Sequence, residues 1–330
     1  MKSTTLPSIS QTPGRLLPIS HLLMHVGRSL LLPLIGILLF LFLWSNTARM
    51  VHTSLGTFPG PAQVWEQATN LIAEHRQERQ RAHDFIARQE ARNAQILAAN
   101  PQAQVTIRPY TGNPTFVDQI GTSLVTVLSG FILASLIAIP LGILIGLNEW
   151  VYAAVNPLIQ LFKPVSPLAW LPLVTMVVSA VYVSQDPEFS KSFLTSMFTV
   201  LLCCLWPTVI NTAVGVANVS KDLLNVSQVL RLGVLTHVFK IIVPASLPLM
   251  FTGLRLSLGI AWMVLIAAEM LAQNPGLGKF VWDEFQNGSS SSLGRIMVAV
   301  LVIGLIGFLL DRSMLFLQRK VSWDKQAVLR

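Results

Sequence analysis

Apolar residues dominate long stretches of this chain, and polar residues gather in the segments between them. A membrane-spanning helix needs roughly 20 mostly apolar residues, and five or six stretches qualify as candidates. The stretches that we expect to span the membrane are approximately 30–44, 121–147, 168–183, 193–216, 247–272 and 296–310. The pattern predicts an all-α polytopic membrane protein with about six transmembrane helices in one membrane domain.

The intervening segments divide the chain further. Residues 1–28 are rich in Ser, Thr and Pro, and they predict a loose tail ahead of a first, retained transmembrane helix at 29–48. Residues 49–117 contain many helix-forming residues up to Pro101, which predicts a helical insertion on the outer side. This insertion is either a solvated helix or helical hairpin, or a docking surface for an outside partner. A membrane core at 118–317 follows, with a polar loop at 218–246 and a tail at 318–330.

Composition and charge agree with a membrane protein. The 330 residues are 52% hydrophobic and 12% charged, whereas soluble domains are about 25% charged. A net charge of +8 is compatible with nucleic-acid binding, but basic residues in a membrane protein more often mark cytoplasmic segments, so we expect no nucleic-acid partner. Six spans place three basic groups on one side: Lys2, Arg15 and Arg28; Lys221, Arg231 and Lys240; and Arg312, Arg319, Lys320, Lys325 and Arg330. Both termini are therefore predicted to be cytoplasmic.

Motifs of covalent chemistry are missing from the sequence. It contains no HExxH, no GxSxG and no GxxxxGK[ST] phosphate-binding loop. None of its six histidines lies in a proposed span, and Cys203 and Cys204 are adjacent in an apolar stretch, where neighbours have the wrong geometry for an ordinary disulfide. We therefore expect no enzyme activity, metal or cofactor, and any ATP that drives this protein must bind to another chain.

The loop at 218–246 has the pattern of two short amphipathic helices. Ser220 is placed to cap a helix from Lys221, and Gly233 is a natural helix terminator. A second helix is expected from Leu235 until Pro244 and Pro248 redirect the chain. The pair is either a connector on the membrane surface or a rigid knob that a soluble partner receives in a groove.

This loop resembles the cytoplasmic coupling loop of ABC-transporter permeases, which reads EAA, three residues, Gly, and an apolar stretch ending in Leu-Pro. Aligning Pro244 with the motif's Pro places Asn225 at its Glu and Arg231 at its Gly, while Gly233 is displaced by two positions. The resemblance implies that the loop contacts an ATPase subunit, through Asn225, Val226, Ser227, Arg231, Gly233, His237 and Pro244.

The stretches KPVSPLAWLP, LWPTVINTAVGV and AEMLAQNPGLGKFVWDEFQNGSSSSLGRIMVAV most closely resemble nitrate permeases, with bicarbonate, cyanate and sulfonate permeases as relatives. The resemblance covers about 116–317. It implies a type I ABC importer permease fold in the bacterial inner membrane and a homodimer that works by alternating access. Its implied partners are cytoplasmic ATPase subunits, a periplasmic or lipid-anchored substrate-binding protein, and a small anion.

A small anion crossing the bilayer needs hydrogen-bond donors along its route. The candidates for this route are Trp170, Trp206, Asn211, Arg255, Trp262 and Glu269. Packing is an alternative role for each Trp, and Arg255 lies near enough to one end of its span to snorkel. A carboxylate repels anions, so a structural or gating hydrogen bond is the better interpretation of Glu269.

Two other classes of membrane protein are less compatible with the sequence. An ATP-independent secondary transporter is expected to carry coupling carboxylates at midmembrane, but only Glu269, near one end, is available. An intramembrane enzyme requires clustered His, Asp or Ser groups in the spans, which the sequence does not offer. The sequence leaves open which anion is carried and what the 62–113 part of the insertion does.

Overall fold

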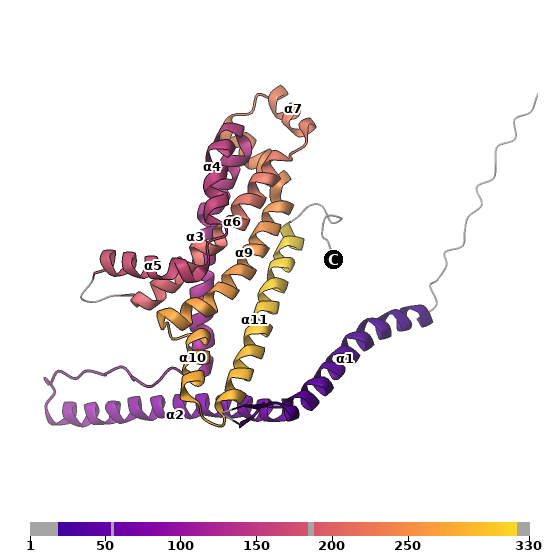
Figure 1. The fold of residues 1–330 in the computed structure, drawn as a ribbon. Helices are drawn as coiled ribbons and strands as arrows, with labels where there is room; N and C mark the ends of the chain where they lie inside the picture. Colours follow the sequence, from indigo (N-terminus) through magenta and orange to yellow (C-terminus); the bar gives the residue numbers. More distant parts are fainter. Residues whose placement is uncertain (1–18, 54–55, 184–187, 322–330) are drawn as a thin grey trace, which may run out of the picture. The chain divides into compact units, whose positions relative to one another are not determined.

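The computed structural model describes residues 19–53, 56–183 and 188–321 (Figure 1). Much of both predicted tails, with Lys2, Arg15, Lys325 and Arg330, lies outside the described residues. The chain divides into two compact units, 1–62 and 63–330.

The first unit is dominated by one apolar helix, α1 (Ile19–Met50), whose backbone begins inside the segment that we expected to be a tail. Its apolar side chains from Leu31 to Leu43 are largely exposed, as expected for a helix that faces lipid. A two-residue antiparallel hairpin of β1 (His52–Thr53) and β2 (Gly56–Thr57) follows. The Trp44 indole N–H donates to the Pro59 carbonyl at 3.2 Å and ties the chain after the hairpin to the helix end.

The second unit is a helical bundle. Its elements are α2 (Pro61–Ala99), which begins at the unit boundary, α3 (Phe116–Leu147), α4 (Glu149–Phe162), α5 (Pro167–Val181), α6 (Lys191–Ala217), α7 (Lys221–Val229), α8 (Val234–His237), the π-helical turn η1 (Val238–Ile242), α9 (Val243–Ala272), α10 (Leu277–Asn287) and α11 (Ser292–Val321). Among the described residues, five helical segments are long and apolar enough to span a membrane, or six if α4 and α5 together form one span. The expected number of about six spans is confirmed in this sense.

The third expected span is broken. Helices α4 and α5 are bent by 100° relative to each other across residues 163–166. Pro164 and Pro167 lie at this break, where each removes a backbone donor and disfavours helix in the residue before it. The predicted stretch at 168–183 corresponds only to α5, which has 15 residues and needs α4 to complete a span.

Helix α6 packs closely against two neighbours, α3 and α9. A Cβ added to Gly130, Gly142 or Gly146 of α3 would lie 2.6–2.9 Å from atoms of α6, so these glycines let the two backbones approach. The residue numbers of the contacting positions rise together on the two helices, so α3 and α6 run parallel to each other. The glycine pair 142 and 146, which looked like a weak GxxxG signal, therefore packs α3 onto α6.

Helix α9 runs antiparallel to α6. The Thr208 and Ser257 hydroxyls lie 2.7 Å apart, and the Ser257 hydroxyl also donates to the Cys204 carbonyl at 2.5 Å. Gly253 lies where a Cβ would be 2.7 Å from the Asn211 Cβ. Buried hydroxyls are costly unless they are paired, so these bonds fix the register of α6 on α9.

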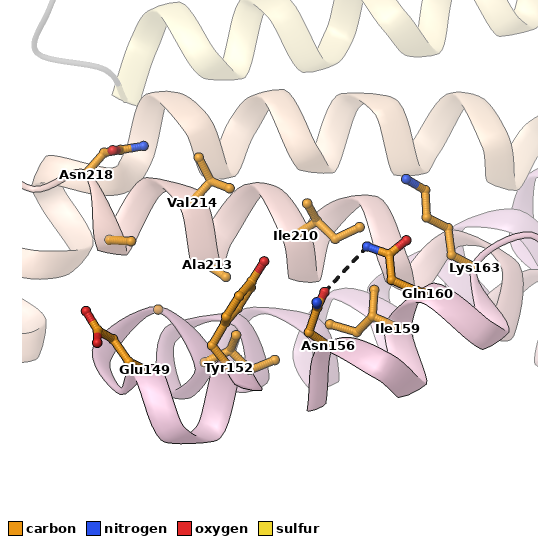
Figure 2. A pocket seen from close by; sticks show the side chains of 13 residues that line it. Glu149, Tyr152, Asn156, Ile159, Gln160, Lys163, Ile210, Ala213, Val214 and Asn218 are labelled. Atoms are coloured by element: carbon orange, nitrogen blue, oxygen red, sulfur yellow. Dashed lines mark hydrogen bonds between the residues drawn. The ribbon is translucent and has the colours of Figure 1, made fainter. Parts of the chain in front are cut away.

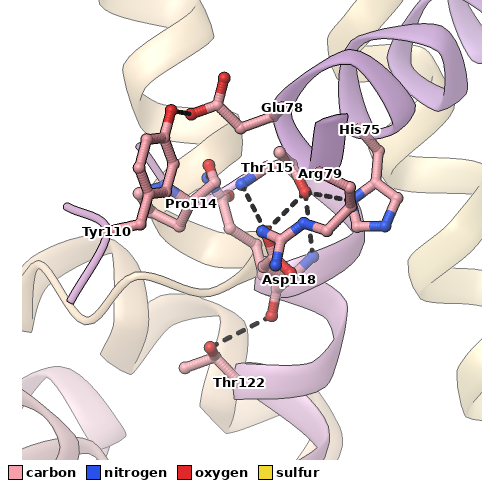
Figure 3. A network of polar contacts seen from close by, with 9 residues as sticks. His75, Glu78, Arg79, Tyr110, Pro114, Thr115, Asp118 and Thr122 are labelled. Carbon is pink, nitrogen blue, oxygen red and sulfur yellow. Dashed lines mark hydrogen bonds and ion pairs between the residues drawn. The ribbon is translucent and has the colours of Figure 1, made fainter. Parts of the chain in front are cut away.

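Helix α2 is one continuous helix, which decides against a helical hairpin. It joins the bundle at the end where α3 and α11 begin. Arg79 forms an ion pair with Asp118 at 2.8 Å, and Arg295 donates to both carboxylate oxygens of Glu74. His75 lies 2.7 Å from the Thr115 hydroxyl, and Thr115 and Asp118 form a capping box at the start of α3 (Figure 3).

The segment after α2 returns along it in an extended form. Gln89 exchanges hydrogen bonds with the backbone of Arg108, and the Tyr110 hydroxyl donates to Glu78 at 2.7 Å (Figure 3). This bond lowers the pKa of the Glu78 carboxyl and raises that of the Tyr110 hydroxyl. The insertion is therefore a helix with an extended segment packed along it rather than a loose loop.

The close approach of α3 to α6 can be tested at Gly142. We expect Gly142→Leu to lower the free energy of unfolding by more than about 2 kcal/mol, because the side chain would overlap Thr212 and the Val209 carbonyl. Gly304→Ala is the control, since nothing lies within 4 Å of an added Cβ there; it should be neutral or stabilising by up to about 1 kcal/mol. Thermal unfolding of both purified variants measures the difference, and equal midpoints would contradict this packing.

Candidate functional site

The 218–246 loop contains two short helices, as expected, but they end differently from the prediction. Ser220 occupies the N-cap position of α7, yet its hydroxyl makes no capping hydrogen bond. Gly233 has φ −65° and begins α8, so it is not the terminator of α7. Pro244 and Pro248 do not redirect the chain either, because residues 234–272 form one continuous helical segment. The π-helical turn η1 ends at Ile242, two residues before Pro244, and its backbone hydrogen bonds span five residues instead of four.

Arg231 is the residue that ends α7. It has φ 47°, in the left-handed region, while the Leu232 N–H donates to the Ser227 carbonyl and the Arg231 N–H to the Gln228 carbonyl. This pair of bonds is a Schellman motif, whose left-handed position is usually glycine. The ungapped alignment placed the glycine of the EAA pattern at position 231. The left-handed backbone conformation that suits glycine is therefore present at this position, although the residue is Arg231.

One hydrogen bond joins the two helices of the loop. The buried hydroxyl of Ser227 on α7 lies 2.6 Å from Nδ1 of His237 on α8. Asn225 and Val226 precede it with exposed side chains, and Pro244 lies in the first turn of α9, also exposed. The predicted contact residues therefore lie on α7, in the turn after it, on α8 and at the start of α9, and the Ser227–His237 bond fixes α7 relative to α8.

The loop exposes several apolar side chains among its polar ones. Val229, Val234 and Leu235 expose 81%, 78% and 74% of their surface, and Leu223, Val226, Leu230 and Phe239 are also exposed. These seven side chains are called the apolar face below. Exposed apolar groups on short helices between polar residues are typical of a surface that a partner covers.

The six residues proposed for the anion route do not form one cluster. Asn211 donates to the Pro207 carbonyl at 2.8 Å, and the Trp262 indole N–H donates to the Ile303 carbonyl at 3.0 Å. Arg255 binds Asp311 of α11 through both carboxylate oxygens, with 2.9 Å between Nη2 and Oδ2. Asp311 is thus the ion-pair partner of Arg255. The sequence did not indicate this pair, because Asp311 follows the last apolar stretch.

Trp170 and Trp206 differ from the other four candidates. Their indole N–H groups are buried and have no hydrogen-bond partner among the described residues. Phe162, at the end of α4, lies between them: its ring is 5.9 Å from that of Trp170 and stacks on Trp206 at 6.3 Å. A buried donor without an acceptor is uncommon in proteins, so these two indoles remain the candidates with free hydrogen-bonding capacity.

Glu269 is fully buried at the opposite end of the bundle from the loop. Its carboxylate accepts from the Ser123 hydroxyl at 2.8 Å and from the Gly278 N–H at 3.0 Å, and the Leu277 N–H donates in turn to Ser123. A Cβ on Gly276 would lie 2.1 Å from the carboxylate, so this glycine lets the chain close over it. The structure thus gives Glu269 the hydrogen bonds of a structural group that joins α3, α9 and α10.

The family described as "Binding-protein-dependent transport system inner membrane component" matches residues 138–323. The chain belongs to this family. Its loop and bundle are accordingly those of a multi-pass membrane permease.

Several relatives are anion permeases by name. The chain is 40% identical over 203 residues to the nitrate import permease protein NrtB of Synechocystis sp.. This alignment covers 62% of this chain and 69% of the relative. It is 33% identical to the bicarbonate transport system permease protein CmpB of Synechococcus elongatus over 88% of both chains. These relatives are transport subunits.

The fold is shared with a solved transporter. An inward-facing structure of the MetNI methionine ABC transporter matches with a TM-score of 0.54 and 12% identity, over 62% of this chain and 95% of that chain. At this identity the likeness concerns the fold alone. It confirms the expected permease fold of ABC importers for the bundle.

The end of α7 generates a prediction that separates two neighbouring residues. Arg231→Gly should preserve or raise stability by up to about 1–2 kcal/mol, because glycine adopts φ > 0 without penalty. Arg231→Val should destabilise the loop, since a β-branched side chain strongly disfavours that region. Gly233→Ala is the matched control and should be tolerated, because its φ is ordinary and nothing lies within 4 Å of the new Cβ. Thermal unfolding and yield of folded protein measure all three, and damage by Gly233→Ala would contradict the assignment of the terminator.

Proposed function

We propose that this permease carries a small anion, with nitrate or nitrite as the first candidate, inward across the bacterial inner membrane. The relatives' names support an anion, and bicarbonate, cyanate and sulfonate are the alternatives within the same family. An ATP-independent secondary anion transporter is a less favoured alternative, because Glu269, the intramembrane carboxylate that it would need, is already engaged in structural hydrogen bonds.

The observation that carries the coupling part of the proposal is the apolar face of the 218–246 loop. The seven exposed apolar side chains, on α7, α8 and the turns that directly follow them, fit the groove of a cytoplasmic ATPase subunit, which binds the ATP that this chain has no motif for. The Ser227–His237 bond keeps the two helices from sliding against each other. Closure of the ATPases would then push both helices together, and the continuous segment 234–272 would pass this movement into the bundle.

The remaining parts of the assembly follow from this placement. The loop faces the cytoplasm, and so do both termini, while α2 and α10 lie outside. A periplasmic or lipid-anchored substrate-binding protein delivers the anion to that outer end, and two copies of this chain form a homodimer around the route. Alternating access then moves the anion without covalent chemistry, cofactor or metal in this subunit.

Docking of the ATPase is tested with one variant and one control in the same loop. Leu235→Asp places a charge in the apolar face and should reduce copurification of the ATPase by at least about tenfold, because a buried unpaired charge costs several kcal/mol. Gln228→Asp changes an exposed polar residue of α7 and should leave copurification within about twofold. Equal copurification of the two variants would contradict docking through the apolar face.

The substrate is tested with the whole assembly in vesicles. We expect ATP hydrolysis, in the presence of the binding protein, to rise several-fold on adding nitrate and less on adding bicarbonate. Stimulation by bicarbonate but not nitrate would assign the protein to the second substrate, and stimulation by none of nitrate, nitrite, bicarbonate, cyanate and a sulfonate would contradict anion import.

A further inference from the structure

A cavity of about 400 Å³ with a mainly apolar lining lies between α4 and the cytoplasmic ends of α3 and α6. Glu149, Tyr152, Asn156, Gln160 and Lys163 line it along one side of α4 (Figure 2). Small or apolar residues of α3 and α6, including Gly146 and Ala213, form much of the opposite wall, with Asn218 at one end. Because these polar residues recur every three or four positions, they form a polar stripe along α4. The spans expected from the sequence did not include this helix.

Lys163 marks one end of this cavity and the break in the third span. It directly follows α4 and precedes the four-residue break at which the chain bends by 100°. Its ammonium group has no ion pair or hydrogen bond to any residue in the described part of the chain, while neighbouring positions are apolar. An ionisable group within a span is costly and usually faces a cavity or a substrate route.

The distribution of charge in the cavity favours an anion at the Lys163 end. Glu149 is the acidic residue of the lining, but it is 14 positions away along the helix, or about 21 Å. It lies with Asn218 at the cytoplasmic mouth, whereas Lys163 lies with Gln160 and Asn156 (Figure 2). The carboxylate therefore neither neutralises the ammonium group nor repels an anion beside it.

Two side-chain amides complete the chemistry of that end. Gln160 donates to Asn156 Oδ1 at 3.4 Å, which leaves the Asn156 amino group available as a donor. One ammonium group and an amide donor match a small oxyanion, whose charge is spread over several acceptor oxygens. The cavity is far larger than one water molecule, whose share of liquid volume is about 30 Å³, so a small anion fits with part of its hydration.

We propose that Lys163, with Asn156 and Gln160, forms a binding site at which the transported oxyanion pauses on the cytoplasmic half of its route. This assignment rests on the proposed function, since it takes the anion to be the cargo. The phosphate of an anionic lipid offers the same chemistry. The transported anion is favoured because α3 and α6 wall the cavity and its polar lining continues to the cytoplasmic mouth.

The first experiment compares the original assembly with three variants in vesicles of purely zwitterionic lipid, and repeats the comparison with anionic lipid added. Lys163→Met should lower nitrate-stimulated ATP hydrolysis at limiting nitrate by about tenfold, the effect of losing one charge-assisted hydrogen bond. Lys163→Arg keeps the charge and should stay within about threefold of the original chain. Lys191→Met is the control, because Lys191 lies exposed at the opposite end of α6 from Asn218; it should have no effect.

The outcomes separate this inference from the proposed function. No stimulation of the original assembly by any anion would overturn the proposed function itself. Normal stimulation with a fully active Lys163→Met assembly would overturn only the site. A loss in Lys163→Met that appears only when anionic lipid is present would also overturn it, because the site would then hold a lipid headgroup.

A second measurement reports binding without transport and remains informative if Lys163→Met assembles poorly. In a chain with Cys203→Ala and Cys204→Ala, Ile210→Cys places a thiol in the α6 wall of the cavity without replacing a residue of the proposed site. Nitrate should slow the reaction of this thiol with a small neutral maleimide at least about threefold, and the protection should vanish when Lys163→Met is added. Equal protection with and without the lysine would contradict binding at Lys163.

Discussion

The architecture depends on the burial of one carboxylate at the outer end of the bundle. Glu269 is fully buried, and an ionised or neutral carboxyl there is tolerable only if its oxygens are satisfied by hydrogen bonds. Ser123 supplies a hydroxyl from α3 and Gly278 a backbone N–H from the first turn of α10. Gly276 makes room for the chain to close over the group. A single side chain of α9 thereby fixes α3, α9 and α10 at one point.

Close backbone packing connects the outer end of the bundle to its opposite end. Glycines of α3 meet α6, and Gly253 of α9 meets the turn of α6 that contains Pro207 and Asn211. The Arg255–Asp311 pair adds α11 to the same assembly. Because interdigitated helices of this kind move as units rather than deform smoothly, the push on α8 that we propose would reach the outer end through α9. Helix α4, the first half of the broken pair, lines the cavity that contains Lys163 together with the ends of α3 and α6.

The sequence predicted the parts of the structure that follow from local pattern. Apolar length located the spanning helices, and alternating faces located α7 and α8. It failed where the outcome depends on backbone geometry or on a distant partner. Gly233 looked like a terminator because glycine tolerates φ > 0, but hydrogen bonding placed that conformation at Arg231.

The same reasoning explains what was missed at the candidate sites. Asp311 and Lys163 fell just outside the apolar stretches at 296–310 and 168–183, so neither was weighed as an intramembrane charge. Their roles depend on Arg255, which is 56 positions from Asp311, and on the 100° break beside Lys163. Glu269 was interpreted from the sequence as a hydrogen-bonded structural or gating group, but its partner Ser123, 146 positions away, could be identified only from the fold.

The most direct test of this account is a double-mutant cycle on the free energy of unfolding, measured by detergent titration, with Ser123→Ala, Glu269→Met and the pair. If the buried carboxylate holds α3 to α9 and α10, the two changes should be coupled by at least about 1 kcal/mol, because each removes the other's hydrogen-bond partner. Additive effects within about 0.5 kcal/mol would show that the two groups act independently and would contradict the central role given to Glu269.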